Sequence, residues 1–232
     1  MRHIRAIAIC ALLLLPVAAF AGDIIDGVVA TVNRKPVLQS EWDEATRFEA
    51  FMQQKPLRAV TESDRVRALQ RLIDRRLLEF EMTGAGVMAP SHEELRADIA
   101  KLRAQIPSAK DEKGWQAVVA SYGLAERNIE DHLRSETQTM NFIDARLRPN
   151  IHVQPQEVEE YYRSQLLPDL EKSGMKVVTL QEVEPRIREL LMQQRIGELL
   201  EAWLHNLRQQ TPVQSSVPLP TPKIASEGLG ES

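Results

Sequence analysis

Apolar side chains recur at spacings of three and four residues along most of the chain, and this spacing is typical of amphipathic helices. One such stripe consists of Val66, Leu69, Ile73, Leu77 and Phe80. Similar stripes predict helices over residues 40–55, 61–83, 91–106, 115–122 and 125–147. Ser40, Thr61 and Ser91 are the expected N-caps of the first three helices, because a hydroxyl oxygen can accept from a free N–H of the first turn.

A strand pattern occurs only near the start, in residues 27–38, which read GVVATVNRKPVL. Its first half is rich in β-branched residues. The run Asn33-Arg34-Lys35 can turn the chain, and Pro36-Val37-Leu38 can return as an edge strand. We expect this hairpin to pair either with an extended stretch at 177–179 or with Val213.

The C-terminal third begins with a helix over about 155–165, where Pro155 suits the first helical position and Pro168 breaks or kinks the helix. Thr179 with Glu182 forms a capping box that starts a last helix, over about 180–210. That helix has apolar residues on more than one side, so it needs neighbours around it. The sequence therefore predicts a mainly α fold with one small β-hairpin.

The first 21 residues have the three parts of a cleavable secretory signal peptide, namely a basic start, an apolar run and a small-x-small site. Cleavage is expected between Ala21 and Gly22. An uncleaved anchor is the alternative, but a membrane-spanning helix needs about 20 apolar residues and this stretch is shorter. We therefore expect an exported chain that does not stay inserted in a membrane.

Composition excludes several classes of site and partner. Cys10 is the sole cysteine and is lost with the leader, so the mature chain has no disulfide and no thiol nucleophile. The leader also takes Arg2 and Arg5, leaving 27 basic against 33 acidic residues and a net charge of −6. This balance argues against nucleic-acid binding, for which a basic face is typical.

Motifs for catalysis, metal binding and cofactor binding are missing. The chain has no Gly-rich phosphate loop and no Gly-x-Ser-x-Gly elbow. His92-Glu93-Glu94 begins like a zinc-protease motif but lacks the second histidine, and Ser173-x-x-Lys176 lacks its companion motifs. His132, His152 and His205 have no ligand at helical spacing, so we expect them at the surface or facing a partner. No cofactor is expected.

The order of four segments resembles SurA-type periplasmic chaperones, which are related to parvulin foldases. The segments are Asp26–Asn33 with the Pro-Val-Leu return, Arg71–Leu78, Val153–Val158 with Tyr161-Tyr162, and Thr179–Arg208. The resemblance implies a helical core at 23–150 that the helix at 180–211 completes by packing back on it. Residues 212–232, with four prolines, are expected to be a disordered tail.

One departure from this family affects function. SurA-like proteins usually carry one or two parvulin isomerase domains before the last helix. Here a short connector at 151–179 takes that place, too short for an ordinary domain of about 50 residues or more. The family's isomerase activity is therefore not carried over to this chain.

The resemblance implies a periplasmic, ATP-independent holdase whose partners are unfolded secreted or outer-membrane proteins. Flexible methionines and aromatic side chains suit reversible contacts with such clients. The candidate client-binding residues are Trp42, Phe48, Phe51, Met52, Met82, Met140 and Met192. Two alternatives stay open: a foldase with residual prolyl isomerase activity, and a structural adaptor for one folded envelope partner.

Overall fold

The computed structural model describes residues 26–219. The expected signal peptide, with its cleavage site at Ala21 and Gly22, lies outside the described residues, as does the tail beyond residue 219. The described part is mainly α-helical with a small antiparallel sheet, which confirms the predicted fold class.

Helices and strands follow one another in an order that places two strands first and one last. They are β1 (Val28–Val32), β2 (Lys35–Leu38), α1 (Gln39–Met52), α2 (Glu62–Met82), α3 (His92–Ala104), α4 (Glu112–Ser121), α5 (Glu126–Leu147), α6 (Pro155–Tyr161), α7 (Leu167–Lys172), α8 (Leu180–Gln210) and β3 (Val213–Ser215). Short 3-10 turns at Leu57–Ala59 and Arg148–Asn150 follow α1 and α5.

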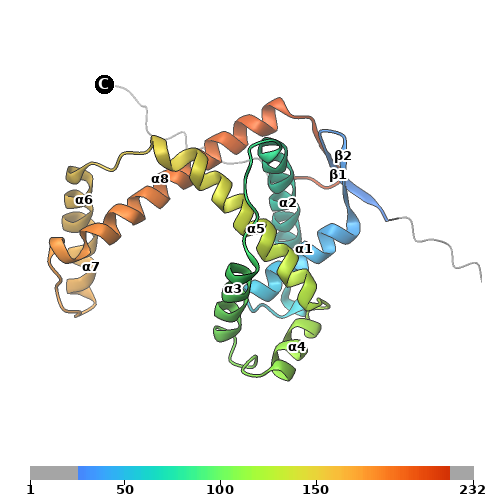
Figure 1. Ribbon diagram of the computed structural model, residues 1–232, viewed down its shortest axis with the longest axis horizontal. Helices are drawn as coiled ribbons and strands as arrows, with labels where there is room; N and C mark the ends of the chain where they lie inside the picture. The colour runs from blue at the N-terminus through green and yellow to red at the C-terminus, as the bar shows by residue number, and fades with distance from the viewer. Residues whose placement is uncertain (1–25, 220–232) are drawn as a thin grey trace, which may run out of the picture.

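The body of the molecule is built around the sheet, whose strand order is β2-β1-β3. Buried side chains of β1 and β2 share one hydrophobic core with α1, α2 and parts of α5 and α8. The long helix α8 therefore packs back on the N-terminal helices, as expected (Figure 1). The hairpin turns through Asn33 and Arg34, which both have positive φ, at 49° and 65°.

The third strand decides between the two expected partners of the hairpin. The partner is Val213, which is part of β3 and lies opposite Val32 of β1. Residues 176–179 form no strand. The prediction of a disordered tail from residue 212 was therefore wrong for residues 213–215, because main-chain bonding to β1 orders them despite their loop-like composition.

The start of α1 also differs from the prediction. Leu38, and not Ser40, occupies the N-cap position, and its N–H donates to the Glu41 carboxylate at 2.9 Å. The Gln39 N–H donates to the carbonyl of Gly27, so the sheet itself fixes where the helix begins. Thr61 and Ser91 are the N-caps of α2 and α3, as predicted.

A lobe projects from the body and has its own core (Figure 1). It consists of α3, α4 and the first half of α5, closed by the last turns of α1. Trp115 is fully buried at its centre, with the ring of Phe51 edge-on at 5.8 Å. The lobe and the body are thus joined through α1 and α5, which contribute side chains to both cores.

An arm projects from the other end of the body, formed by α6, α7 and the first half of α8 (Figure 1). Its buried apolar side chains are Val158, Leu170 and Ile187. Pro168 was expected to break or kink the helix, yet the helix continues to Lys172 through a π-helical turn at Tyr162–Leu166. We attribute this turn to Pro168, whose nitrogen has no hydrogen to donate to the preceding turn.

Candidate functional site

The three aromatic residues predicted to contact clients are all core residues. Trp42 is 5% exposed, and its indole N–H donates to the carbonyl of Arg65 at 2.7 Å. Phe48 and Phe51 are buried in the lobe core. These side chains stabilise the fold, and in this structure they offer no surface to a client.

The four predicted methionines are more accessible. Met52 and Met140 are exposed, at 39% and 51%. Met82 and Met192 are half-buried, and Met192 packs against the body core. The structure therefore leaves Met52 and Met140 as the predicted residues that a second molecule could reach directly.

In the described part of the chain, seven further large apolar side chains are exposed, namely Val28, Leu57, Met88, Met175, Val177, Leu190 and Leu199. Met88 and Met175 belong to the residue type that the sequence indicated for client contacts. Leu190 and Leu199 lie on α8, and the unusual spread of apolar residues around that helix was the signal that could have identified them. Met88, Met175 and Val177 lie in loops, where no periodic pattern separates exposed from buried positions.

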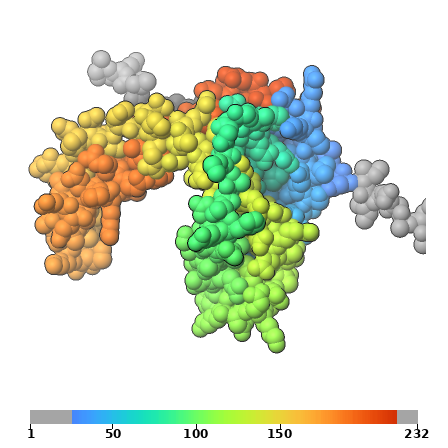
Figure 2. Space-filling view, viewed as in Figure 1, coloured from blue at the N-terminus to red at the C-terminus, as the bar shows by residue number. Residues whose placement is uncertain are grey.

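An open hollow separates the arm from the lobe (Figure 2). Above it, α5 packs against α8, and both helices carry exposed apolar side chains, Met140 on α5 and Leu190 on α8. A concave surface with apolar side chains on its bordering helices can contact a flexible chain on several sides. This is the candidate functional site of the described part of the molecule.

Polar contacts between the end of α5 and the arm fix the shape of this hollow. The Arg148 guanidinium donates two hydrogen bonds, each 3.0 Å long, to the carboxylate of Glu189 on α8. Hydrogen bonds from Arg148 and Gln193 lower the pKa of Glu189 to about 2, so the pair stays charged at neutral pH. Arg188 also donates to the carbonyl of Val153, at 2.8 Å.

A second feature is a charged pocket of about 200 Å³ between α1, α2 and α5. Its lining residues are Glu41, Glu44, Leu72, Arg75, Arg76, Glu79, His132 and Ser135. Most of its charges already have partners, because Arg76 bonds to both Glu41 and Glu79 and His132 bonds to Glu44. The pocket is therefore best described as a polar contact between three helices.

His132 was expected at the surface or facing a partner, and that prediction was wrong. Its side chain is only 11% exposed. The ring stacks on Phe48 with centroids 4.2 Å apart, Nε2 lies 3.1 Å from Glu44, and Nδ1 lies 3.5 Å from Arg75. An arginine only donates, so Nδ1 is the acceptor and Nε2 carries the hydrogen.

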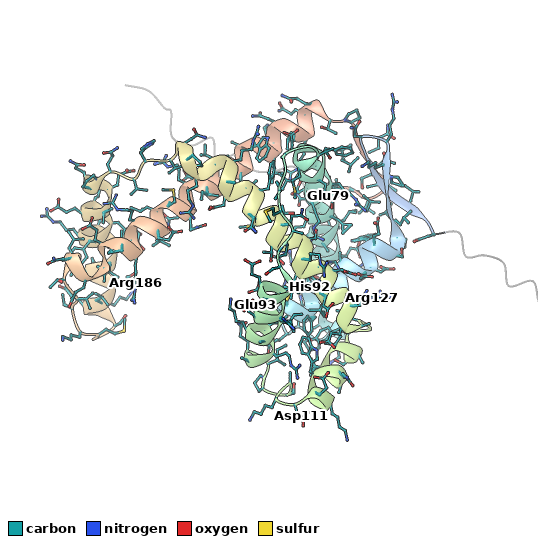
Figure 3. All side chains as sticks on the ribbon, viewed as in Figure 1. Glu79, His92, Glu93, Asp111, Arg127 and Arg186 are labelled. Atoms are coloured by element: carbon teal, nitrogen blue, oxygen red, sulfur yellow. The ribbon has the colours of Figure 1, made fainter. Side chains whose placement is uncertain are left out.

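The motif that begins like a zinc site is a helix cap in the structure. Figure 3 shows His92 and Glu93 at the start of α3, on the lobe. Glu94 accepts the N–H of Ser91 at 2.7 Å and completes the capping box. Across residues 26–219, His, Asp and Glu side chains form no group that could hold a metal ion.

Between residues 26 and 219, no helix is both long enough and apolar enough to cross a membrane.

Comparisons with known proteins bear on this site. A search of the curated proteins finds no match. A family model for the SurA-like N-terminal domain matches residues 1–142, and no parvulin domain is detected in the 232 residues. The matched region covers the sheet hairpin, α1 to α4 and most of α5, while the arm and α8 lie beyond it. Because the match spans more than half of the sequence, the chain belongs to the SurA-like N-terminal domain family.

Proposed function

We propose that this protein is an ATP-independent periplasmic holdase that binds unfolded secreted or outer-membrane proteins without acting as a prolyl isomerase. The observation that carries the proposal is the family match over residues 1–142, which suggests a chaperone-like role. The hollow between arm and lobe supports it, since exposed Met140 and Leu190 lie on its bordering helices. Detection of no parvulin domain supports the second half of the proposal.

The physical basis is reversible burial of client side chains. Burying apolar surface contributes about 25 cal/mol per Å², so one methionine or leucine contact is weak and several together hold a chain. Methionine adapts to clients of different shape because its side chain is unbranched and polarisable. Weak single contacts also allow a client to leave without ATP hydrolysis.

A light-scattering experiment tests the holdase activity. An outer-membrane protein unfolded in urea is diluted into buffer with the purified chain at several molar ratios, or with an inert folded protein at equal mass. We expect scattering to fall as the chain is added and not with the inert protein. Unchanged scattering at several-fold molar excess would rule out the proposed function.

The proposed lack of isomerase activity needs its own measurement. Refolding of a substrate limited by proline isomerisation takes about 10–100 s at 25 °C, so catalysis is easily seen. We expect the chain to leave this rate unchanged. Catalytic acceleration would instead support the foldase alternative, and capture of one folded partner with no effect on unfolded chains would support the adaptor.

The proposed location is tested separately. After expression of the full chain in a two-membrane bacterium, the periplasmic fraction and the mass of the mature protein are measured. We expect the protein in that fraction with Gly22 as its first residue. Full-length protein retained in the cytoplasm would contradict the location.

A further inference from the structure

The two outer edges of the sheet differ in what they offer to another chain. At the β2 edge, Pro36 has no N–H, and the N–H of Leu38 already donates to Glu41. Proline and satisfied donors are common ways of protecting a sheet edge from further pairing. The β2 edge is therefore closed to strand addition.

The main-chain groups of β3 alternate in direction, as in any antiparallel pair. The Asn33 N–H donates to the carbonyl of Pro212 at 3.0 Å, and the Ser216 N–H donates to the carbonyl of Val29 at 2.9 Å. In this register Gln214 lies opposite Thr31. Residues 212, 214 and 216 thus turn their main-chain groups toward β1, and Val213 and Ser215 turn theirs away from it.

The groups that face away have no partner in the described structure. Within residues 26–219, the main-chain N–H and C=O groups of Val213 and Ser215 make no hydrogen bond to main-chain or side-chain atoms. A groove of about 270 Å³ is lined by residues 28–31 of β1 and by residues 214–216, so it lies over the paired strands β1 and β3. Val28 borders this groove and is 53% exposed, which adds an apolar surface to the same small sheet.

We propose that the β3 edge binds an extended segment of an unfolded client by strand addition, with its main chain paired to Val213 and Ser215. Alternating donors and acceptors fit an extended main chain of any sequence, which suits a chaperone with many clients. This inference rests on the proposed holdase function and adds a second contact site to the hollow.

A second copy of the protein fits this edge less well. Two copies paired through β3 would share a contact of only three residues each. A stable protein–protein interface buries about 800 Å² on each partner, far more than such a contact supplies. A short, weak pairing is suited instead to a flexible chain that binds and leaves.

Amide hydrogen exchange measured by NMR tests the inference on the full purified chain. The probe is an extended peptide from an outer-membrane strand, compared with the same sequence N-methylated at every main-chain nitrogen. We expect exchange at Val213 and Ser215 to slow when the unmodified peptide is added. We expect the N-methylated peptide to bind about tenfold or more weakly, since it has no main-chain N–H to donate.

A proline variant gives a second measurement. Ser215→Pro removes one outward N–H and leaves the bonds of Gln214 to β1 in place, whereas Ser215→Ala keeps the N–H. Loss of one hydrogen bond predicts peptide binding about threefold to tenfold weaker for the proline variant alone. Equal melting temperatures of the two variants would show that both are folded. If Ser215→Pro does not fold, the comparison with the N-methylated peptide still tests the inference.

The outcomes separate this inference from the holdase proposal. Peptide binding without slower exchange at Val213 and Ser215 would overturn the inference and leave the holdase proposal standing. No binding of any unfolded chain would overturn both. Slower exchange that grows with protein concentration alone would assign the edge to a second copy.

Discussion

Arg208 of α8 donates to the carboxylate of Asp74 on α2, across 134 residues of sequence, with Nε 2.9 Å from Oδ1. Both side chains are mostly buried, at 23% and 17% exposed. Burial raises the pKa of Asp74, and the Arg208 guanidinium opposes that rise. The pair thus joins the returning C-terminal helix to the N-terminal core.

Breaking this pair is expected to destabilise the fold. Arg208→Met leaves the Asp74 carboxylate buried without its partner, and we expect the free energy of unfolding in urea to fall by about 2 kcal/mol. The double variant Asp74→Asn with Arg208→Met should recover part of this loss. Arg195 forms an exposed pair with Glu157, so Arg195→Met should change the free energy of unfolding by no more than about 0.5 kcal/mol. Equal effects at both positions would contradict the role of burial.

A second prediction concerns the hairpin turn. Arg34 has φ of 65°, a conformation that disfavours residues with a Cβ and suits glycine. We expect Arg34→Gly to raise the free energy of unfolding by about 1 kcal/mol, because Asn-Gly is the preferred pair in such turns. Arg34→Ala keeps the Cβ and should give no comparable gain. Thermal or urea unfolding of the native chain and the two variants measures these differences in stability.

His132 predicts a pH dependence near neutrality. Its pKa is lowered from 6.5, first by burial and then by the charge of Arg75, while Glu44 and Asp131 oppose the shift. The unfolded chain therefore takes up a proton at higher pH than the folded chain. The stability contribution of neutral His132 is complete above pH 6.5 and is lost as the pH falls from 6.5 toward the lowered pKa.

Urea unfolding between pH 7.5 and 5.5 measures this effect. We expect the native chain to lose stability across this window and His132→Gln to lose less. His152→Gln, at an exposed position, serves as the matched control and should keep the native slope. Identical slopes for the native chain and His132→Gln would show that His132 does not titrate differently on folding.

The exposed apolar positions predict variants that lose activity without losing stability. Met140→Glu and Leu190→Glu place a charge on the helices that border the hollow, at side chains 51% and 40% exposed. We expect each to reduce suppression of aggregation severalfold with an unchanged melting temperature. Met140→Leu keeps the apolar surface, and Gln209→Glu adds a charge at an exposed site near the other end of α8. Both controls should retain activity.

Local features could be read directly from the sequence. Thr61, Ser91 and Thr179 each begin a helix as predicted, because a capping box depends on residues within three positions of one another. The hairpin turn at Asn33 and Arg34 depends on its own two residues in the same way. Resemblance to the SurA-type chaperones also came from sequence, and the family match agrees with it.

Tertiary structure decided which apolar residues are accessible. The spacing of apolar residues does not distinguish Trp42 from Met140, but Trp42 is buried in the body core and Met140 is 51% exposed. His132 became a buried member of a polar network through residues more than 50 positions away.

The sequence by itself determined most of the helices, the caps of α2, α3 and α8, the hairpin and the family, since these depend mainly on neighbours within a few residues. Only the tertiary structure decided the pairing of β3, the burial of the aromatic residues and the hollow between arm and lobe. The physical reason is that burial and strand pairing depend on contacts between distant segments, and spacing along the chain does not specify which segments meet.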